Sequence, residues 1–133
     1  MLENRKELAN YRLESARDCL AASAKLLNDN LYKDSINRSY YAIFHAMRAV
    51  MALDKSDFKK HSAVISFFNK NYIKTGKLDN KFSGIIQNAF NIRNDSDYED
   101  FFIVSRDEAQ AQYYNAKVFI EAVEDYLDTI FLG

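Results

Sequence analysis

The chain has 133 residues, 48% of them hydrophobic, and its 18 Lys and Arg nearly balance its 19 Asp and Glu. This length accommodates one domain with a substantial core but not two, so we expect a single domain over residues 1–133. Proline is absent and glycine occurs only three times. Because both residues interrupt helices, their scarcity predicts an all-α fold.

Composition also argues against several classes of protein. The single cysteine, Cys19, has no partner for an internal disulfide and no neighbours at metal-ligand spacing. The first ten residues lack the apolar core of a signal peptide, and no apolar run approaches the roughly 20 residues of a membrane-spanning helix. The sequence has no glycine-rich phosphate loop and no nucleophile with a base at a recognised spacing. We therefore expect a soluble cytoplasmic protein with no cofactor and no membrane contact.

The first two predicted helices each carry an apolar seam with alternating steps of four and three residues, a spacing typical of helices packed side by side. In the first helix the seam consists of Ala9, Leu13, Ala16, Leu20, Ser23 and Leu27. In the second helix it consists of Ile36, Tyr40, Ile43, Met47 and Val50. Beside the second seam runs a row of small residues that lets another backbone come close, namely Ser39, Ala42, Ala46 and Ala49.

Three further helices follow in the pattern. A short one contains the apolar residues between positions 64 and 72 and ends before Gly76, which can adopt the left-handed cap conformation. A fourth begins near residue 79, and a fifth begins at Ser105, whose partner Glu108 completes a capping box. The seam of the fifth helix consists of Ala109, Tyr113, Ala116, Ile120, Val123, Leu127 and Ile130. Four long helices and one short one, with brief polar connectors, predict an antiparallel up-and-down bundle.

The second helix carries a polar and aromatic stripe opposite its apolar seam. At about 100 degrees per residue, one arc of its surface contains Arg38, Tyr41, His45 and Arg48. Such a stripe faces a cleft, a partner subunit or water, which makes Arg38, Tyr41 and Arg48 candidate binding residues. The alternative is that both arginines are ordinary surface charges, while Tyr41 and His45 bond to each other or to the backbone.

Arg93 stands in the apolar seam of the fourth helix, at the end of that helix. Steps of four, three and four residues from Phe82 reach it. A guanidinium in this position needs partners: Asp95 or Asp97 would make a structural salt bridge, and an RNA phosphate would make an anion site. Spacing alone favours the salt bridge. His61, at the entrance to the third helix, is expected to cap or pack there rather than to titrate in a reaction.

A lysine-rich segment precedes an acidic C-terminal part. Its lysines are Lys55, Lys59, Lys60, Lys70, Lys74, Lys77 and Lys81. They could meet phosphates, or the acidic segment of the same or another subunit. Because no arginine is among them, solvated surface lysines are favoured over a nucleic-acid surface.

Three runs of the sequence stand out together: RSYYAIFHAMRAVMAL at 38–53, KKHSAVISFFNKNYIKTGKL at 59–78 and AFNIRNDSDYED at 89–100. In this order they resemble the HEPN family of small prokaryotic helical-bundle proteins, from about Leu31 to the last helix. The resemblance implies a homodimer whose two bundles share a cleft. For many members it also implies a metal-independent RNase, often a toxin encoded beside a small nucleotidyltransferase that neutralises it.

The resemblance also implies site residues. The family's motif is an arginine, a polar residue, several further residues and a histidine. Arg93 and Asn94 match its beginning, but Tyr98 stands five residues after the arginine, where the family has its histidine. A tyrosine of ordinary pKa, about 10, is a poor proton acceptor, so this departure weakens the expectation of an enzyme. The residues of a possible catalytic site are then Arg93, Asn94 and Tyr98, with His45 in place of the missing base.

Three functions stay open at this point. The first is a homodimeric module that binds RNA or a nucleotide near Arg93 and Tyr98, with Arg38, Tyr41 and Arg48 as further binding residues, or that docks a nucleotidyltransferase as in toxin–antitoxin pairs. The second is a metal-independent RNase in which Arg93 stabilises developing phosphate charge and His45 or Tyr98 acts as base. The third is a purely structural interaction protein, whose Arg93 bridges Asp95 or Asp97 and touches no ligand.

Overall fold

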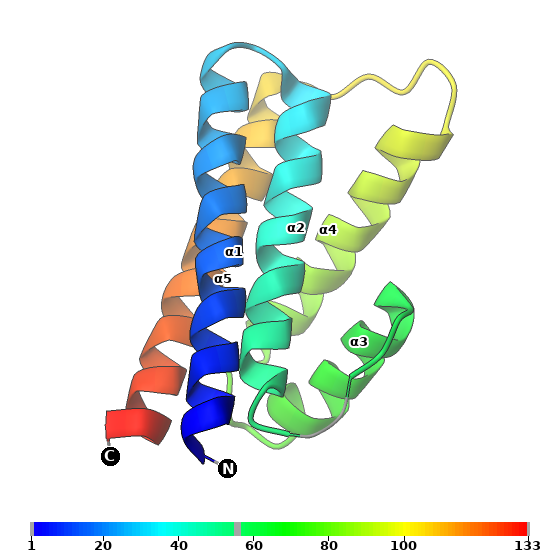
Figure 1. The fold of residues 1–133 in the computed structure, drawn as a ribbon. Helices are drawn as coiled ribbons and strands as arrows, with labels where there is room; N and C mark the ends of the chain where they lie inside the picture. Colours follow the sequence, from blue (N-terminus) through cyan, green and yellow to red (C-terminus); the bar gives the residue numbers. More distant parts are fainter. Residues whose placement is uncertain (1, 55–56, 133) are drawn as a thin grey trace.

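The computed structural model describes residues 2–54 and 57–132, and every regular element in these ranges is a helix. The elements are α1 (Leu2–Asn28), α2 (Tyr32–Met51), α3 (His61–Phe68), the π-helical segment η1 (Asn69–Ile73), α4 (Lys81–Tyr98) and α5 (Arg106–Leu132). The long helices α1, α2, α4 and α5 alternate in direction (Figure 1). The predicted all-α bundle of four long helices and a short one is confirmed. None of the helices in the described ranges is both long and apolar enough to cross a membrane.

α2 is the central helix and contacts α1, α3, α4 and α5. Every member of its predicted apolar seam, from Ile36 to Val50, is at most 2% exposed. Its small residues Ser39, Ala42, Ala46 and Ala49 are fully buried, as their closeness to another backbone requires. Because these two faces are covered, the residues of α2 after Asn37 that keep partial exposure are those of the polar stripe.

Two predictions about the ends of helices are confirmed. The Glu108 backbone N–H donates to Ser105 Oγ at 3.1 Å, so Ser105 caps the start of α5. Gly76 has a φ of 78°, in the left-handed region. There a Cβ would add strain, so glycine ends the α3–η1 segment at low cost.

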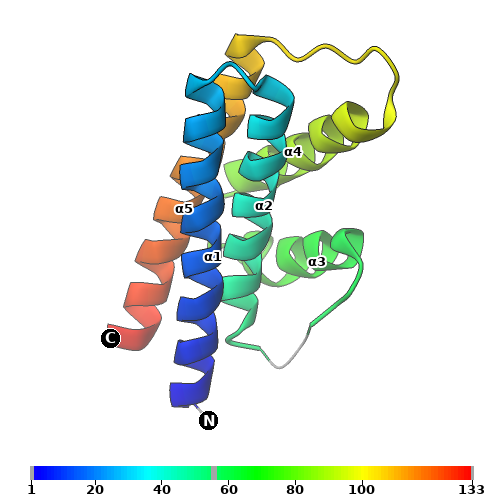
Figure 2. The same ribbon diagram turned by 45° about the horizontal axis from the view of Figure 1, so that its top comes forward.

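α4 is longer than the sequence pattern indicates. Arg93 was expected at the end of the helix, but the helix continues to Tyr98 and is capped at Glu99. Its last residues are mostly polar, and this part of α4 diverges from α2 (Figures 1 and 2). Arg93 and Asp97, one turn apart, form an i,i+4 pair that supports this extension. Arg93 is therefore an interior residue of α4.

Candidate functional site

The candidate site lies where α2, α4 and the first residue of α3 meet. Arg93 projects from α4 toward the polar stripe of α2 and is only 9% exposed. Its guanidinium carbon lies 4.8 Å from the ring centroid of Tyr40 and 5.4 Å from that of Tyr41. At these distances the negative faces of the rings attract the cation. We call Arg93, Tyr40, Tyr41 and His61 the arginine site.

Hydrogen bonds fix the guanidinium of Arg93 in place. Nη2 donates to the hydroxyl of Tyr41 at 3.3 Å and lies 3.4 Å from Nδ1 of His61. Nη1 donates to the side-chain oxygen of Asn94 at 3.1 Å. The three partners, Tyr41, His61 and Asn94, are uncharged. They therefore orient the guanidinium without neutralising its positive charge.

The salt bridge that spacing predicted for Arg93 forms with Asp97, but it is long. Among the residues that the structure describes, Asp97 alone has a carboxylate within 4 Å of the guanidinium, and its nearest N–O distance is 3.7 Å. Asp95, the other predicted partner, forms no ion pair with Arg93 in this part of the chain. Nε of Arg93 is buried and has no hydrogen-bond partner among the described residues. A guanidinium that is oriented, weakly paired and incompletely bonded retains capacity for an anion.

His61 is held by two rings of α2. Its Nδ1 lies 2.8 Å from the hydroxyl of Tyr40, and its ring stacks on Phe44 with centroids 4.1 Å apart. Burial, followed by the positive charges of Arg93 and Arg48, lowers the pKa of His61. Near neutral pH the imidazole is therefore uncharged.

The tautomer of His61 follows from its neighbours. Burial raises the pKa of Tyr40 above the usual tyrosine value, against the opposing charge of Arg93. The Tyr40 hydroxyl therefore keeps its proton and donates it to Nδ1 of His61. Arg93 presents an N–H group to the same nitrogen. With two donors directed at Nδ1, the neutral ring carries its proton on Nε2.

Two of the predicted catalytic residues do not join this cluster directly. Tyr98 is 78% exposed at the last turn of α4. His45 is half-buried, with its ring centroid 6.2 Å from that of Tyr41, and it forms no side-chain hydrogen bond within the described ranges. Burial, then the charges of Arg48 and Arg38 followed by smaller contributions from other neighbours, lowers the pKa of His45. His61, rather than His45, is the histidine that contacts Arg93.

The two arginines of the α2 stripe have different surroundings. The guanidinium carbon of Arg38 lies 5.0 Å from the ring centroid of Tyr41, and Nη2 donates to Asn37 at 2.7 Å. Arg48 instead donates to Asp57 at 2.9 Å. The same carboxylate also accepts from Arg12 at 3.3 Å. Arg38 therefore flanks the arginine site, whereas Arg48 belongs to a neighbouring surface.

That neighbouring surface contains a pocket of about 480 Å³, which we call the Phe58 pocket. It is lined by Phe44, Arg48, Asp57, Phe58, Lys59 and His61. Because its wall includes His61, the pocket adjoins the arginine site. No group of three or more His, Cys, Asp or Glu side chains within residues 2–54 and 57–132 is arranged to hold a metal ion.

A model of the HEPN domain matches residues 9–126 of the chain. The chain belongs to the HEPN domain family. It is 31% identical, over 95% of its own length and 85% of the relative, to a Methanocaldococcus jannaschii protein named "Putative toxin". A second protein of that organism with the same kind of name is 30% identical, over 89% of this chain and 87% of the relative. A Thermotoga maritima protein named "UPF0332 protein" is 26% identical, over 97% of this chain and 98% of the relative.

Sequence reasoning about this HEPN chain overlooked two members of the arginine site, His61 and Tyr40, the latter assigned only to the apolar seam. Arg93 and Tyr41 were selected from helical spacing and Asn94 from the family motif, and the structure brings Tyr41 and Asn94 into contact with Arg93. His61 was expected to cap or pack at the start of α3; it packs, but its side chain also bonds to Tyr40. It is 32 positions from Arg93 in the chain, so no local spacing links them. Only the fold, which sets the start of α3 against α2, reveals the contact.

Proposed function

We propose that this chain is the toxin-like member of a toxin–antitoxin pair, and that it binds RNA through a phosphate group at the arginine site. The observation that carries the proposal is the state of Arg93, which is buried and oriented by neutral groups, and whose one ion pair among the described residues, with Asp97, is long at 3.7 Å. A phosphate would supply the close anionic partner that Asp97 does not. The names of the two relatives from Methanocaldococcus jannaschii support the toxin role.

We further propose that the working form is a homodimer, with a small nucleotidyltransferase as the neutralising partner. Family membership supports both parts of this statement. Large apolar side chains are exposed where α4 ends and the connection to α5 begins, since Phe101 is 99% and Ile103 84% exposed. Exposed apolar groups close together are characteristic of protein contacts. Tyr98, also exposed, lies near them in the chain and can serve either a second subunit or a bound base.

The test is RNA binding by purified protein, with Arg93→Met compared against Arg106→Met. Arg106 is an exposed arginine at the start of α5 and provides a matched loss of charge. We expect salt-sensitive binding of single-stranded RNA by the parent protein. Loss of charge-assisted hydrogen bonds at Arg93 should weaken binding about tenfold to a hundredfold, with little change for Arg106→Met. A lower melting temperature for Arg93→Met with unchanged RNA affinity would instead support the purely structural role.

A second candidate function, a metal-independent RNase, is favoured by one contact. The neutral imidazole of His61 lies 3.4 Å from Arg93, which pairs a proton-transfer group with a cation able to stabilise phosphate charge. In this candidate His61, rather than His45 or Tyr98, is the proton-transfer group, and it acts as base when a substrate hydroxyl replaces Tyr40 as the donor to Nδ1. RNA incubated in EDTA should be cleaved by the parent protein and by His45→Asn, but not by His61→Asn. Equal cleavage by His61→Asn would exclude His61 from that role.

A further inference from the structure

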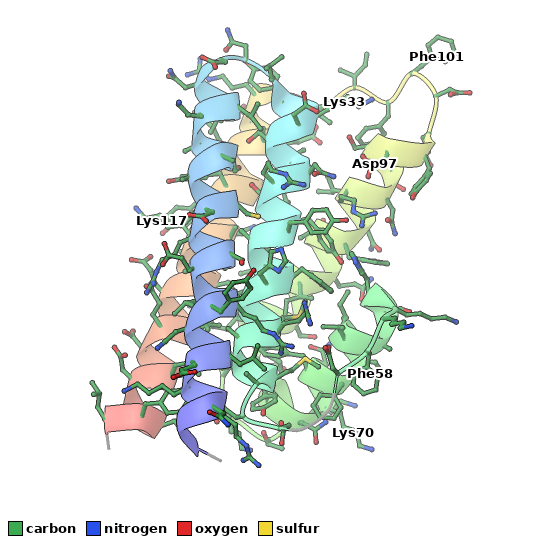
Figure 3. All side chains as sticks on the ribbon, in the orientation of Figure 1. Lys33, Phe58, Lys70, Asp97, Phe101 and Lys117 are labelled. Atoms are coloured by element: carbon green, nitrogen blue, oxygen red, sulfur yellow. The ribbon has the colours of Figure 1, made fainter. Side chains whose placement is uncertain are left out.

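The Phe58 pocket lies between the C-terminal half of α2 and the segment that leads into α3. Phe44 and Arg48 come from α2, Asp57, Phe58 and Lys59 precede α3, and His61 is its first residue. Its volume of about 480 Å³ lies in the range of pockets that hold small organic groups. Figure 3 shows Phe58 on the α3 side of the molecule, across from Lys117 on α5.

Aromatic side chains give the pocket a surface for stacking. Phe58 is 37% exposed, yet its ring is supported by Phe67, whose centroid lies 5.3 Å away. Phe44 is stacked on His61, so these two rings form a second aromatic surface in the wall. Exposed aromatic rings that are held in place from behind are the platforms on which the bases of single-stranded RNA stack.

The charge of the pocket suits a phosphate backbone. Asp57 accepts from both Arg12 and Arg48, so one carboxylate faces two cations, and Lys59 adds a further exposed amine. Nε of Arg48 is buried and unbonded among the residues described. Positive charge next to aromatic surface is the combination found in grooves that follow single-stranded nucleic acid.

His61 connects this pocket to the arginine site. Its ring contributes to the pocket wall, while its Nδ1 lies 3.4 Å from Arg93. We propose that the Phe58 pocket binds the base of a nucleotide in single-stranded RNA, next to the nucleotide whose phosphate contacts Arg93. This inference rests on the proposed function and assigns it a ligand class and a second subsite. Phe58 supplies stacking, and Arg48 and Lys59 attract the backbone.

The experiment uses short single-stranded RNA and variants that isolate each contribution. Phe58→Ala should weaken binding about tenfold, while Phe58→Tyr should keep the affinity. Tyr114→Ala, at an exposed aromatic residue of α5, should have no effect. Lys59→Gln should reduce the slope of log affinity against log salt concentration by about one, the value for one lost phosphate contact. Lys117→Gln on α5 should leave this slope unchanged. Urea unfolding of each variant separates lost affinity from lost stability.

A set of RNAs that each lack one base identifies the ligand group. At one position, removal of the base should weaken binding to the parent protein about tenfold and leave binding to Phe58→Ala unchanged. If no position shows this coupling, the subsite is excluded. AMP serves as the free-nucleotide probe, and an affinity for AMP equal to that for RNA would overturn the assignment to an RNA strand.

The two proposals fail in different ways. If Arg93→Met binds RNA weakly while Phe58→Ala binds RNA as the parent protein does, the proposed subsite is excluded and the arginine site remains the proposed RNA-binding site. Failure of the parent protein to bind any RNA removes both.

Discussion

The two sides of α2 bury polar groups in different ways. Toward α1, the hydroxyls of Ser23, Ser35 and Ser39 form a fully buried serine network, with oxygen–oxygen distances from Ser23 of 3.1 Å to Ser35 and 2.6 Å to Ser39. Toward α3 and α4, the arginine site combines a weakly paired cation, a neutral histidine and an unbonded Nε. The hydroxyls of the serine network are fully buried and all bonded to one another or to the backbone. The arginine site is equally ordered but keeps bonding capacity, which is what a binding site requires.

The largest stability loss should come from the serine network. Ser23→Val removes the hydroxyl that links Ser35 and Ser39 and leaves buried polar groups without partners. We expect a loss of about 1–3 kcal/mol in the free energy of unfolding, measured with urea, and no change in RNA affinity. The control Ser62→Val, at an exposed serine of α3, should change stability by less than about 0.5 kcal/mol. Equal losses of stability in Ser23→Val and Ser62→Val would contradict the proposed difference between the α1 side and the α3–α4 side of α2.

A smaller loss is expected from Tyr40→Phe, which acts at the arginine site. It deletes the hydroxyl that donates to Nδ1 of His61, and one hydrogen bond of this kind contributes about 1 kcal/mol. Nitrogen chemical shifts of the His61 ring provide a second measurement. In the parent protein they should show a proton on Nε2, and in Tyr40→Phe the preference for that tautomer should weaken. A proton on Nδ1 in the parent protein would contradict the assigned direction of the bond.

The contrast between the two sides also explains how much the sequence could predict. The seam and the small-residue face of α2 follow a helical period, and a period can be read without knowledge of the neighbours. Burial of Ile36, Tyr40 and Ala46 was therefore predictable. Arg93 could be selected for the same reason, because it interrupts an apolar seam at a definite step.

The remaining parts of the arginine site depend on tertiary contacts. The extension of α4 to Tyr98 has little apolar signal, because that end of the helix diverges from the bundle. His61 begins a short helix whose placement against α2 is set by rings from both elements, Phe44 among them. His45 has the regular spacing and His61 does not, so pattern reasoning chose the former. The contact between Arg93 and His61 is a product of the fold.

A third prediction compares the two histidines through their arginines. Arg93 lowers the pKa of His61 and is not among the groups acting on His45, whereas Arg48 lowers both. Arg93→Met should therefore raise the pKa of His61 alone, and Arg48→Met should raise both. Proton NMR titration of the two rings measures this directly. A rise of the His45 pKa in Arg93→Met would show that the arginine site extends further along α2 than its contacts indicate.

The smallest effect should be the pH dependence of stability, because both histidines are partly exposed to solvent. Burial and nearby arginines lower both folded pKa values below 6.5: Arg93 and Arg48 face His61, and chiefly Arg48 and Arg38 face His45. As the pH falls below 6.5, the unfolded chain binds protons first, so the free energy of unfolding decreases.

Asp57 contributes in a separate pH range. Partial burial acts to raise its pKa, but the hydrogen bonds from Arg48 and the backbone of Phe58, with the charges of Arg48 and Arg12, lower it overall. Its contribution is present above its usual value of 3.8 and is lost only as the pH falls below that value. Urea unfolding between about pH 7 and pH 5 therefore reports on the histidines. The double variant His45→Gln with His61→Gln should flatten the curve in this range, and an unchanged slope would mean that other groups cause the decrease.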